Sequence, residues 1–246
     1  MSSTTWTPHA VASEARPVGL CLWRAIEAQH IASTTRLVDN LGEQDLLEQI
    51  LEQTKPNLPP NSQGLHYLLA TPFRYPPSAH GSRFRSGNDS GVFYGADEQR
   101  TACAELGFWR WRFLIDSEGL GEIGPVAHTL FQVNVHANAV DLRKNPFLLQ
   151  ARRWSDPEDY TATQKLGQVA RDANVFLLRY QSVRDPKKGA CGAVLDPSGL
   201  AAPRRPVSEQ TWFLTVTRSF SAWKREGEQF EFVWAKLVSN TGALRA

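Results

Sequence analysis

Three side chains with complementary chemistry stand at equal spacing in the chain: Arg83, Tyr94 and Glu105 are eleven positions apart. An arginine carries a planar, charged fork that binds pyrophosphate. A tyrosine offers an aromatic face to a flat cationic ring, and a glutamate accepts hydrogen bonds from ribose hydroxyls and stabilises a developing oxocarbenium ion. Together these side-chain types predict a site that holds and cleaves a nicotinamide nucleotide.

The neighbours of these three residues strengthen the prediction. Gly81 lets the backbone approach a ligand, and the hydroxyl of Ser82 can donate to a phosphate oxygen. Glu105 stands among small and apolar residues in Thr-Ala-Cys-Ala-Glu-Leu, where a carboxylate must be paired, hydrogen-bonded or turned towards a cavity. The alternatives are an arginine in a surface turn and a core tyrosine with a bonded hydroxyl.

Two further candidates follow an apolar run, residues 175–180, which predicts a buried strand. Ser182 stands where that strand would end, a common place for a ligand contact, and its alternative is an ordinary strand-end hydroxyl. Arg184 is a candidate second contact to phosphate or substrate, and its alternative is a surface ion pair. We therefore expect Arg83, Tyr94 and Glu105 to be catalytic, and the nucleotide to be bound by Arg83, Tyr94, Ser82, Ser182 and Arg184.

The elements that must position these residues mix helix and strand without regular βαβ alternation. Residues 98–109 are expected to form a helix that Asp97 caps, and residues 72–77 to be extended or turning because of their prolines. Other helices are expected at 42–54 and 161–173, and strands at 92–94, 131–137, 175–180, 191–195, 211–216 and 230–234. This mixture predicts an α+β fold.

Length and composition bound the class of protein. The 246 residues carry a net charge of +2, with 41% hydrophobic and 21% charged residues, which fits a globular protein and gives no pull towards nucleic acid or a membrane. Three separated cysteines, no signal peptide and no bilayer-length apolar run indicate the cytoplasm. Metal-ligand spacings are absent, and without a Gly-x-Gly-x-x-Gly fingerprint any NAD site here is not a Rossmann site.

The chain is expected to divide near residue 65. Residues 1–64 are interpreted as a polar tail, over 1–18, and a helical extension, and residues 65–246 as the main domain. The acidic helix at 42–54 and the proline-rich loop at 197–208 are candidate partner surfaces. For the helix the alternative is that it covers its own core.

At the candidate residues the chain resembles the RES-domain family, which is named for an arginine, a glutamate and a serine. The resemblance runs from about residue 65 to residue 195 and rests on four segments taken together: Gly81-Ser82-Arg83-Phe84, Gly91-Val92-Phe93-Tyr94, Thr101-Ala102-Cys103-Ala104-Glu105 and Tyr180-Gln181-Ser182-Val183-Arg184. Many members have Gly-Gly-Arg-Trp-Asn at the first segment. Arg85 would therefore change the charge beside the cleft.

The resemblance implies a compact, mixed-sheet α+β domain similar to diphtheria-toxin-like ADP-ribosyltransferases, with NAD as the substrate and no metal. Arg83 would hold the NAD phosphates or ribose, and Tyr94 would stack on nicotinamide. Glu105 would bind the nicotinamide ribose and stabilise the oxocarbenium ion, while Ser182 would help to position the nucleotide. These roles agree with those expected from the residue types.

Members of the family are typically the toxin halves of bacterial toxin–antitoxin pairs, so the resemblance implies a cognate antitoxin that covers the active site. It also implies transfer of ADP-ribose to a bacterial protein, with a phosphoribosyl-pyrophosphate synthetase as one candidate acceptor. Three alternatives stay open at this stage. They are an NAD glycohydrolase or phosphorylase with the same site, a non-catalytic nucleotide-binding module, and a ribonuclease.

Overall fold

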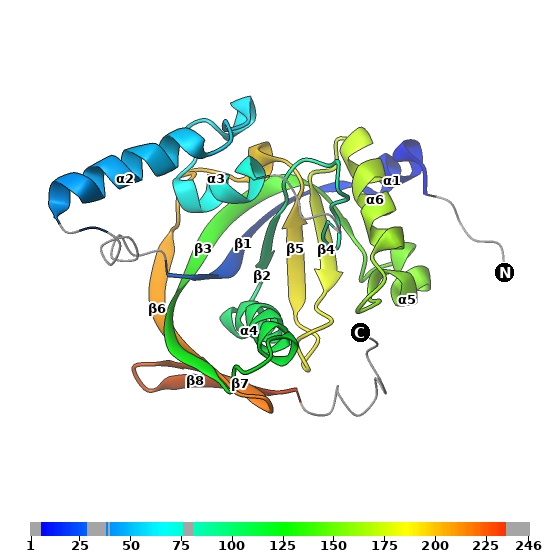
Figure 1. The fold of residues 1–246 in the computed structure, drawn as a ribbon. Coiled ribbons are helices and arrows are strands. Elements are labelled where there is room, and N and C mark those ends of the chain that lie inside the picture. Colours follow the sequence, from blue (N-terminus) through cyan, green and yellow to red (C-terminus); the bar gives the residue numbers. More distant parts are fainter. Residues whose placement is uncertain (1–5, 29–37, 39, 76–80, 235–246) are drawn as a thin grey trace.

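The computed structural model describes residues 6–28, 38, 40–75 and 81–234, and within them eight strands form one mixed sheet (Figure 1). The strands are β1 (Arg16–Glu27), β2 (Phe93–Ala96), β3 (Ile123–Asp141), β4 (Leu177–Gln181), β5 (Ala190–Val194), β6 (Ser208–Val216), β7 (Phe220–Arg225) and β8 (Glu228–Val233). The helices are α1 (Pro8–Glu14), α2 (Leu41–Thr54), α3 (Tyr67–Arg74), α4 (Gln99–Asp116), α5 (Ala151–Trp154) and α6 (Thr161–Asp172), with short 3-10 turns between them.

The sheet order is β1-β2-β5-β4-β3-β6-β7-β8, and β1 also pairs with β3. This second pairing closes the first five strands into a ring, because the long strand β3 pairs with β1 along one edge and with β4 and β6 along the other. The β3–β4 pairing is parallel and the others are antiparallel. The mixed sheet and the surrounding helices confirm the predicted α+β class.

Two glycines allow the ring to close tightly around Leu22, whose side chain is fully buried. A Cβ on Gly95 would lie 2.8 Å from the Cβ of Leu22, and one on Gly192 would lie 2.8 Å from its Cδ1. Real Cβ atoms do not approach that closely, so these positions in β2 and β5 require glycine for β1 to pack against them.

The N-terminal residues take part in the fold, and the interpretation of 1–18 as a loose tail is wrong from residue 6 onwards. Helix α1 has an N-cap at Thr7 and buries Val11 completely. Strand β1 then pairs with β3 over its whole length. Val18 belongs to the alternation of Val18, Leu20 and Leu22, which is a strand pattern, so the ordered chain begins well before the predicted limit of the tail. Residues 1–5 lie outside the described part.

Two local expectations are corrected. The prolines were expected to prevent a helix at 72–77, yet Pro72 lies inside α3, where one missing backbone donor is tolerated because the helix packs its buried face into the core. Pro76 and Pro77 lie outside the described residues. Asp97 does not cap α4: the N-cap is Glu98, and both carboxylate oxygens of Asp97 bind the guanidinium of Arg179.

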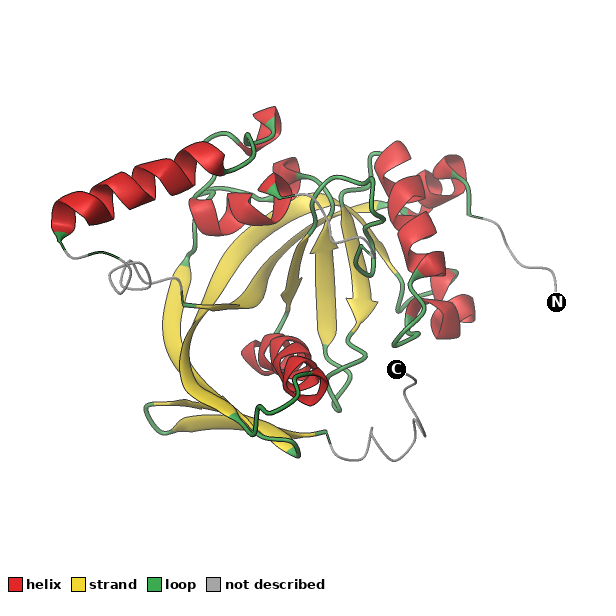
Figure 2. Ribbon diagram, viewed as in Figure 1, coloured by secondary structure: helices red, strands yellow, loops and turns green. Residues whose placement is uncertain are grey.

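Helix α4 lies in the concave hollow of the curved sheet, facing β1 and β2 on one side and the β6–β8 hairpins on the other (Figures 1 and 2). It is longer than predicted because its aromatic second half, with Phe108 and Trp111, packs onto the buried tryptophans of these hairpins. Helices α1, α5 and α6 pack together beside β4. No described helix combines the length and the apolar character that crossing a bilayer requires.

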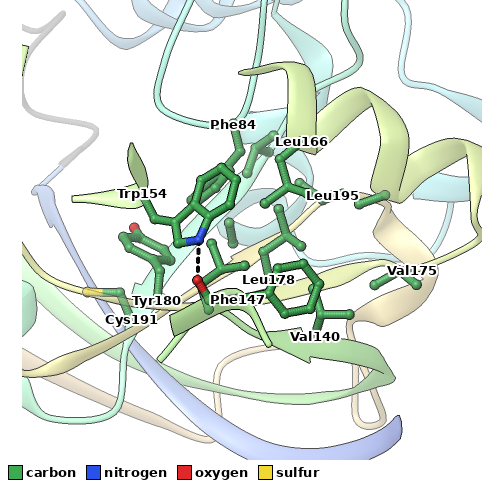
Figure 3. Packing of buried hydrophobic residues seen from close by; sticks show 14 of the residues in the cluster. Phe84, Val140, Phe147, Trp154, Leu166, Val175, Leu178, Tyr180, Cys191 and Leu195 are labelled. Atoms are coloured by element: carbon green, nitrogen blue, oxygen red, sulfur yellow. Dashed lines mark hydrogen bonds between the residues drawn. The ribbon is translucent and has the colours of Figure 1, made fainter. Parts of the chain in front are cut away.

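The buried residues under α5 and α6 support one wall of the candidate active site. Figure 3 shows Trp154 and Phe147 beside Phe84, Leu178 and Tyr180 in this cluster. The indole Nε1 of Trp154 donates to the carbonyl oxygen of Phe147 at 2.8 Å, so the buried nitrogen has a partner. The side chain of Trp154 is therefore fixed in the core, and its backbone carbonyl group is held in place with it.

Candidate active site

A cavity of about 400 Å³ opens between β1, β2, α4 and the turn that follows β4. It is lined by Arg83, Tyr94 and Glu105, so the structure brings the three equally spaced residues together. Ser82 and Arg184 line it as well. The other lining residues are Trp23, Arg24, Ala25, Gly81, Gly95, Ala96, Ala102, Leu106, Trp109, Tyr160, Tyr180 and Cys191.

Arg83 is presented by a tight turn. Ser82 and Arg85 exchange backbone hydrogen bonds of 2.7 and 3.2 Å, and Gly81 before them has a φ of +66°. A Cβ at Gly81 would lie 2.1 Å from the carbonyl oxygen of Arg85, so only glycine fits. Phe84, fully buried, anchors the turn in the core while Arg83 points into the cavity.

Arg83 is only 8% exposed, and its guanidinium is held in a fixed orientation. Its Nη1 donates to the carbonyl oxygen of Trp154 at 3.0 Å, and the group lies 4.6 Å from the centre of the Tyr160 ring. These two contacts occupy one face of the guanidinium plane and one of its N–H groups. The remaining donors stay available to an anion in the cavity.

Tyr94 on β2 is locked through its hydroxyl. The oxygen accepts from the backbone N–H of Phe84 at 3.0 Å and makes a 2.8 Å hydrogen bond with Ser82 Oγ. Burial raises the pKa of Tyr94 above its ordinary value, so the phenol stays neutral. Tyr94 thus ties the arginine turn to the sheet, and its ring lines the cavity.

Glu105 projects from α4 and is oriented by Ser182, whose Oγ donates to its Oε1 at 2.5 Å. Burial raises the pKa of the Glu105 carboxyl, while the Ser182 hydrogen bond and the charges of Arg83 and Arg184 favour the carboxylate. The same Ser182 oxygen accepts the backbone N–H groups of Arg184 and Asp185. Ser182 therefore orients Glu105 and caps the turn after β4, although it does not itself line the cavity.

Arg184 reaches the cavity mouth across an aromatic pair. Its guanidinium lies 3.8 Å from the centre of the Phe108 ring and 5.5 Å from that of Trp109, and its Nη2 donates to the carbonyl oxygen of Pro157 at 2.5 Å. The turn that carries it is fixed to α4 because Asp185 binds Arg100 and Thr101. Among the residues that the structure describes, Arg184 does not form the surface ion pair that was its alternative.

Three arginines line the cavity, and none of them has an ionic partner within the described chain. No Asp or Glu of the described residues forms an ion pair with Arg24, Arg83 or Arg184. By contrast, other arginines such as Arg100 and Arg179 are paired with aspartates. Glu105 is the only carboxylate among the lining residues that lie in the described part of the chain. The cavity is thus positively charged and suited to an anion.

Arg85 does not line this cavity. Its Nε donates to the carbonyl oxygen of Asp89 at 3.2 Å and its Nη2 to that of Tyr75 at 2.8 Å. The guanidinium therefore holds the loop after the Arg83 turn. Neutral carbonyl acceptors leave the positive charge of Arg85 in place, so the change of charge beside the cleft stays a prediction.

Sequence reasoning missed several lining residues that come from elements distant in the chain. Arg24 comes from β1, Tyr160 from the irregular segment before α6, and Tyr180 and Cys191 from the paired strands β4 and β5. The position of Tyr180 directly before the Gln-Ser-Val-Arg segment was the available signal for that residue. Within the described residues no group of three or more His, Cys, Asp or Glu side chains is arranged to hold a metal.

Comparison with known proteins gives a family match. The sequence matches the RES domain family over residues 59–217. Among solved structures, one chain of the M. tuberculosis MbcT–MbcA toxin–antitoxin complex is similar, with 13% identity and a TM-score of 0.46 over 80% of this chain and 86% of that chain. No curated protein sequence matches.

Proposed function

The chain belongs to the RES-domain family, and from that premise and the geometry of the cavity we propose that it cleaves the bond between nicotinamide and ribose in NAD. The observation that carries the proposal is one cavity in which three arginines without ionic partners surround a single oriented carboxylate, Glu105. Its volume, about 400 Å³, lies in the usual range for small-molecule sites.

In the proposed reaction the C1′–N bond breaks and its electron pair passes to the nicotinamide ring nitrogen, leaving an oxocarbenium ion on the ribose. The negative charge of Glu105 stabilises that cation, because the carboxylate is fixed by Ser182 and partly withdrawn from water. Arg83 and Arg184 bind the pyrophosphate. Tyr94, with its fixed neutral ring, stacks on the nicotinamide.

The second half of the reaction adds an acceptor to C1′. A lone pair of the acceptor forms the new bond, and the acceptor's proton passes to Glu105, the only carboxylate among the described lining residues. A protein side chain as acceptor makes the chain a mono-ADP-ribosyltransferase similar to the diphtheria-toxin-like enzymes. We propose this outcome from the family resemblance, with a phosphoribosyl-pyrophosphate synthetase among the candidate acceptors; water or phosphate makes it a glycohydrolase or phosphorylase.

We further propose that the protein acts in the bacterial cytoplasm as a toxin restrained by an antitoxin that covers the cavity. The setting comes from the family resemblance. The structure offers one candidate contact surface predicted from sequence, since α2 is a helix as expected and leaves Leu46, Ile50 and Leu51 exposed. The other, the loop at 197–208, contains the 3-10 turn Pro197–Gly199, and Leu200 directly after it is buried, so only part of the loop is free to meet a partner.

The test follows two products from the same incubation. Purified protein is mixed with NAD carrying a labelled adenylate and with a bacterial lysate, and both free nicotinamide and labelled protein are measured. The variant Glu105→Gln keeps a hydrogen-bond acceptor for Ser182 but lacks the charge, whereas Arg112→Gln removes a charge from an exposed ion pair with Asp116 and is the matched control.

Three results separate the proposals. Nicotinamide together with a discrete labelled protein, both lost in Glu105→Gln and kept in Arg112→Gln, supports the transferase. Nicotinamide without labelled protein, dependent on Glu105, supports cleavage with water or phosphate as acceptor. Folded wild-type protein that releases no nicotinamide contradicts the catalytic proposal and leaves a nucleotide-binding module.

A further inference from the structure

Helix α4 continues beyond the cavity with aromatic side chains exposed. Ala102, Leu106 and Trp109 line the cavity at spacings of four and three residues, so one face of the helix forms part of the cavity wall. Phe113 comes four residues after Trp109 on the same face, beyond the lining residues. Trp109 is 50% exposed and Phe113 is 56% exposed. We call these two residues the aromatic pair.

The aromatic pair begins next to the carboxylate of the proposed reaction. Because an α-helix rises about 1.5 Å per residue, Trp109 lies about 6 Å and Phe113 about 12 Å along the helix axis from Glu105. A protein segment that binds the pair therefore ends within reach of a long side chain from Glu105. Single exposed apolar residues are ordinary, but adjoining aromatic residues at the rim of a cavity are typical of an interaction surface.

The turn after β4 gives the opening of the cavity a positive rim. The guanidinium of Arg184 lies 5.5 Å from the centre of the Trp109 ring, and the same turn carries the exposed residues Lys187 and Lys188. Within the part of the chain that the structure describes, none of these three cations forms an ion pair with a carboxylate. The aromatic pair and its rim are therefore complementary to a segment that combines apolar with acidic side chains.

Nucleic acid also binds aromatic side chains beside cations, but the cations of α4 next to the aromatic pair favour a protein. Arg110 is paired with Glu27 on β1. Arg112 is paired with Asp116 one turn further along α4. A run of phosphates gains affinity from cations that have no carboxylate partner, and these two arginines have one. A second copy of this chain would bring an identical positive rim against this one, and like charges oppose that contact.

We propose that the aromatic pair is the docking surface for the protein acceptor, and that it binds an acceptor segment with apolar and acidic side chains. This inference rests on the proposed transfer of ADP-ribose to a protein and states how that protein is recruited. The docked segment brings its nucleophile to C1′ of the ribose beside Glu105. Phe113 then contributes to recruitment of the acceptor without contacting NAD, whereas Glu105 contributes to cleavage.

The experiment separates recruitment of the acceptor from binding of NAD. Phe113→Asp places a negative charge on the aromatic pair, and Phe213→Asp is the matched control. Phe213 is 49% exposed on β6 and lies on the sheet face opposite α4, because its neighbours Trp212 and Leu214 pack in the same cluster as the buried residues of that helix.

Two quantities are measured for each variant. The rate at which protein is labelled in a bacterial lysate with labelled NAD is expected to fall at least about 10-fold in Phe113→Asp, because loss of a central aromatic residue commonly costs an interface that much affinity. The same rate is expected to stay within about twofold in Phe213→Asp. NAD affinity, measured by calorimetry with Glu105→Gln added to each variant, is expected to stay within about twofold in both.

A second variant tests the charge of the rim. Lys187→Glu is expected to slow protein labelling about threefold at low ionic strength, with the difference lost in about 1 M salt, because rim charges act through screened attraction. Lys224→Glu makes the same change at an exposed lysine of β7 and is the control, expected to slow nothing. A difference that does not depend on salt would contradict the acidic character proposed for the acceptor segment.

Four results overturn the proposal. Wild-type labelling of protein by Phe113→Asp leaves the aromatic pair to the proposed antitoxin. Equal loss of labelling and of NAD affinity means that Phe113 only shapes the cavity. Label that appears on nucleic acid, and is lost from it in Phe113→Asp, assigns the pair to a nucleic-acid acceptor. A wild-type dimer that Phe113→Asp converts to monomers, measured by sedimentation, means that a second copy covers the pair.

The proposed function has a separate readout, the release of nicotinamide by the wild-type protein. If nicotinamide is released and no protein is labelled, cleavage of NAD stands and the docking surface falls. If protein is labelled at the same rate by wild type and Phe113→Asp, the transferase stands and the docking surface falls. If no nicotinamide is released with or without lysate, the proposed function falls, and the docking surface with it.

Discussion

Arginines line two cavities of this molecule, one of about 400 Å³ beside Glu105 and one of about 320 Å³ beside Asp141. We call the second, whose lining includes Arg16, Arg143 and Arg179, the Asp141 cavity. It lies at the other end of β1 and β3. Tyr180 and Arg179, neighbours on β4, point to opposite faces of the sheet and so serve the two cavities separately.

The two cavities differ in what their arginines bind. In the Asp141 cavity Arg143 makes two 2.8 Å hydrogen bonds with Asp141, Arg179 binds both oxygens of Asp97, and Arg16 donates to backbone carbonyls. The hydrogen bonds that Arg143 donates to Asp141 raise the pKa of Arg143, whereas burial lowers the pKa of Arg24 to about 10. In the Asp141 cavity Arg143 and Arg179 are neutralised by aspartates and stabilise the fold, whereas Arg16 has no carboxylate partner among the described residues. All three arginines beside Glu105 lack such a partner and are available to a ligand.

The largest effect that tests this contrast is expected from removing one carboxylate from each cavity: Glu105 from the first, and Asp141, beside which Glu14 also lines the cavity, from the second. Glu105→Gln is expected to lower the rate of nicotinamide release at least about 100-fold, as does loss of other groups that stabilise developing charge. Asp141→Asn, the matched change in the Asp141 cavity, is expected to leave that rate within about twofold. Comparable losses in the two variants, measured by steady-state release of nicotinamide, would remove the distinction between the cavities.

Replacing one arginine in each cavity is expected to change NAD affinity in one case and the free energy of unfolding in the other. Arg179→Gln leaves Asp97 without its partner and is expected to lower the free energy of unfolding by about 1–3 kcal/mol, with NAD affinity unchanged. Arg83→Gln breaks no ion pair, so it is expected to weaken NAD binding about 10- to 100-fold with a much smaller change in stability. Urea unfolding measures the free energy of unfolding, and calorimetry measures NAD affinity. A large loss of stability in Arg83→Gln together with a large loss of NAD affinity in Arg179→Gln would contradict the contrast.

The charge state of Glu105 predicts a pH dependence of activity. Because burial raises its pKa, the carboxylate needed for cleavage is protonated at a higher pH than an exposed glutamate, and the acidic limb of the rate profile lies above pH 4.5. The Ser182 hydrogen bond lowers this pKa, so Ser182→Ala is expected to move the limb to still higher pH. Ser117→Ala, which removes an exposed hydroxyl at the end of α4, is the control and is expected to move nothing.

The raised pKa of Glu105 also predicts the direction in which Glu105→Gln changes the stability of the folded protein. Glu105 in the folded protein has a raised pKa, so ionising it costs folding free energy as the pH rises from the unfolded value of about 4.5 through the folded one. At neutral pH, Glu105→Gln is therefore expected to raise the melting temperature while it abolishes activity. A drop in melting temperature would mean that the hydrogen bond with Ser182 needs the charge.

Part of this site was predictable from the sequence because its signals are local. The equal spacing of Arg83, Tyr94 and Glu105, and a carboxylate among small apolar residues, are visible without a fold, and the structure brings those residues to one cavity. Arg24 carries no such signal. It reaches the cavity through the pairing of β1 with β2 and β3, which joins residues about 70 to 120 positions apart, and such pairing is a tertiary property.

The ion-pair partners of the arginines were equally unpredictable from the sequence. Asp97 looked like a helix cap because it precedes α4, but its choice of Arg179 depends on β4 lying beside β5. Pro72 was taken as a helix breaker, and tertiary packing of α3 overrode that preference. Local chemistry therefore indicated the ligand-binding groups, while the structural ion pairs that distinguish the two cavities required the fold.

The smallest predicted effect tests whether pairing alone separates the cavities. Asp141→Asn removes the partner of Arg143 and leaves a hollow in which Arg16, Arg143 and Lys144 face the one remaining lining carboxylate, Glu14. If neutralised charge is what keeps the Asp141 cavity from binding anions, this variant is expected to gain a weak pyrophosphate site with a Kd of about 1 mM. Side-chain nitrogen resonances of Arg143 report occupancy directly, and Arg83→Gln in the same chain weakens the main site.

The wild-type chain is the control for this gain, because its Arg143 keeps both hydrogen bonds to Asp141 and its resonances are expected to stay unchanged at the same pyrophosphate concentration. A shift in Asp141→Asn alone means that an arginine-lined hollow becomes an anion site once its carboxylate is neutral. No shift in either chain would mean that the cavity beside Glu105 binds anions because of the geometry of its guanidinium groups and its aromatic walls. The absence of ion pairs at its arginines would then be a consequence of that function and not its cause.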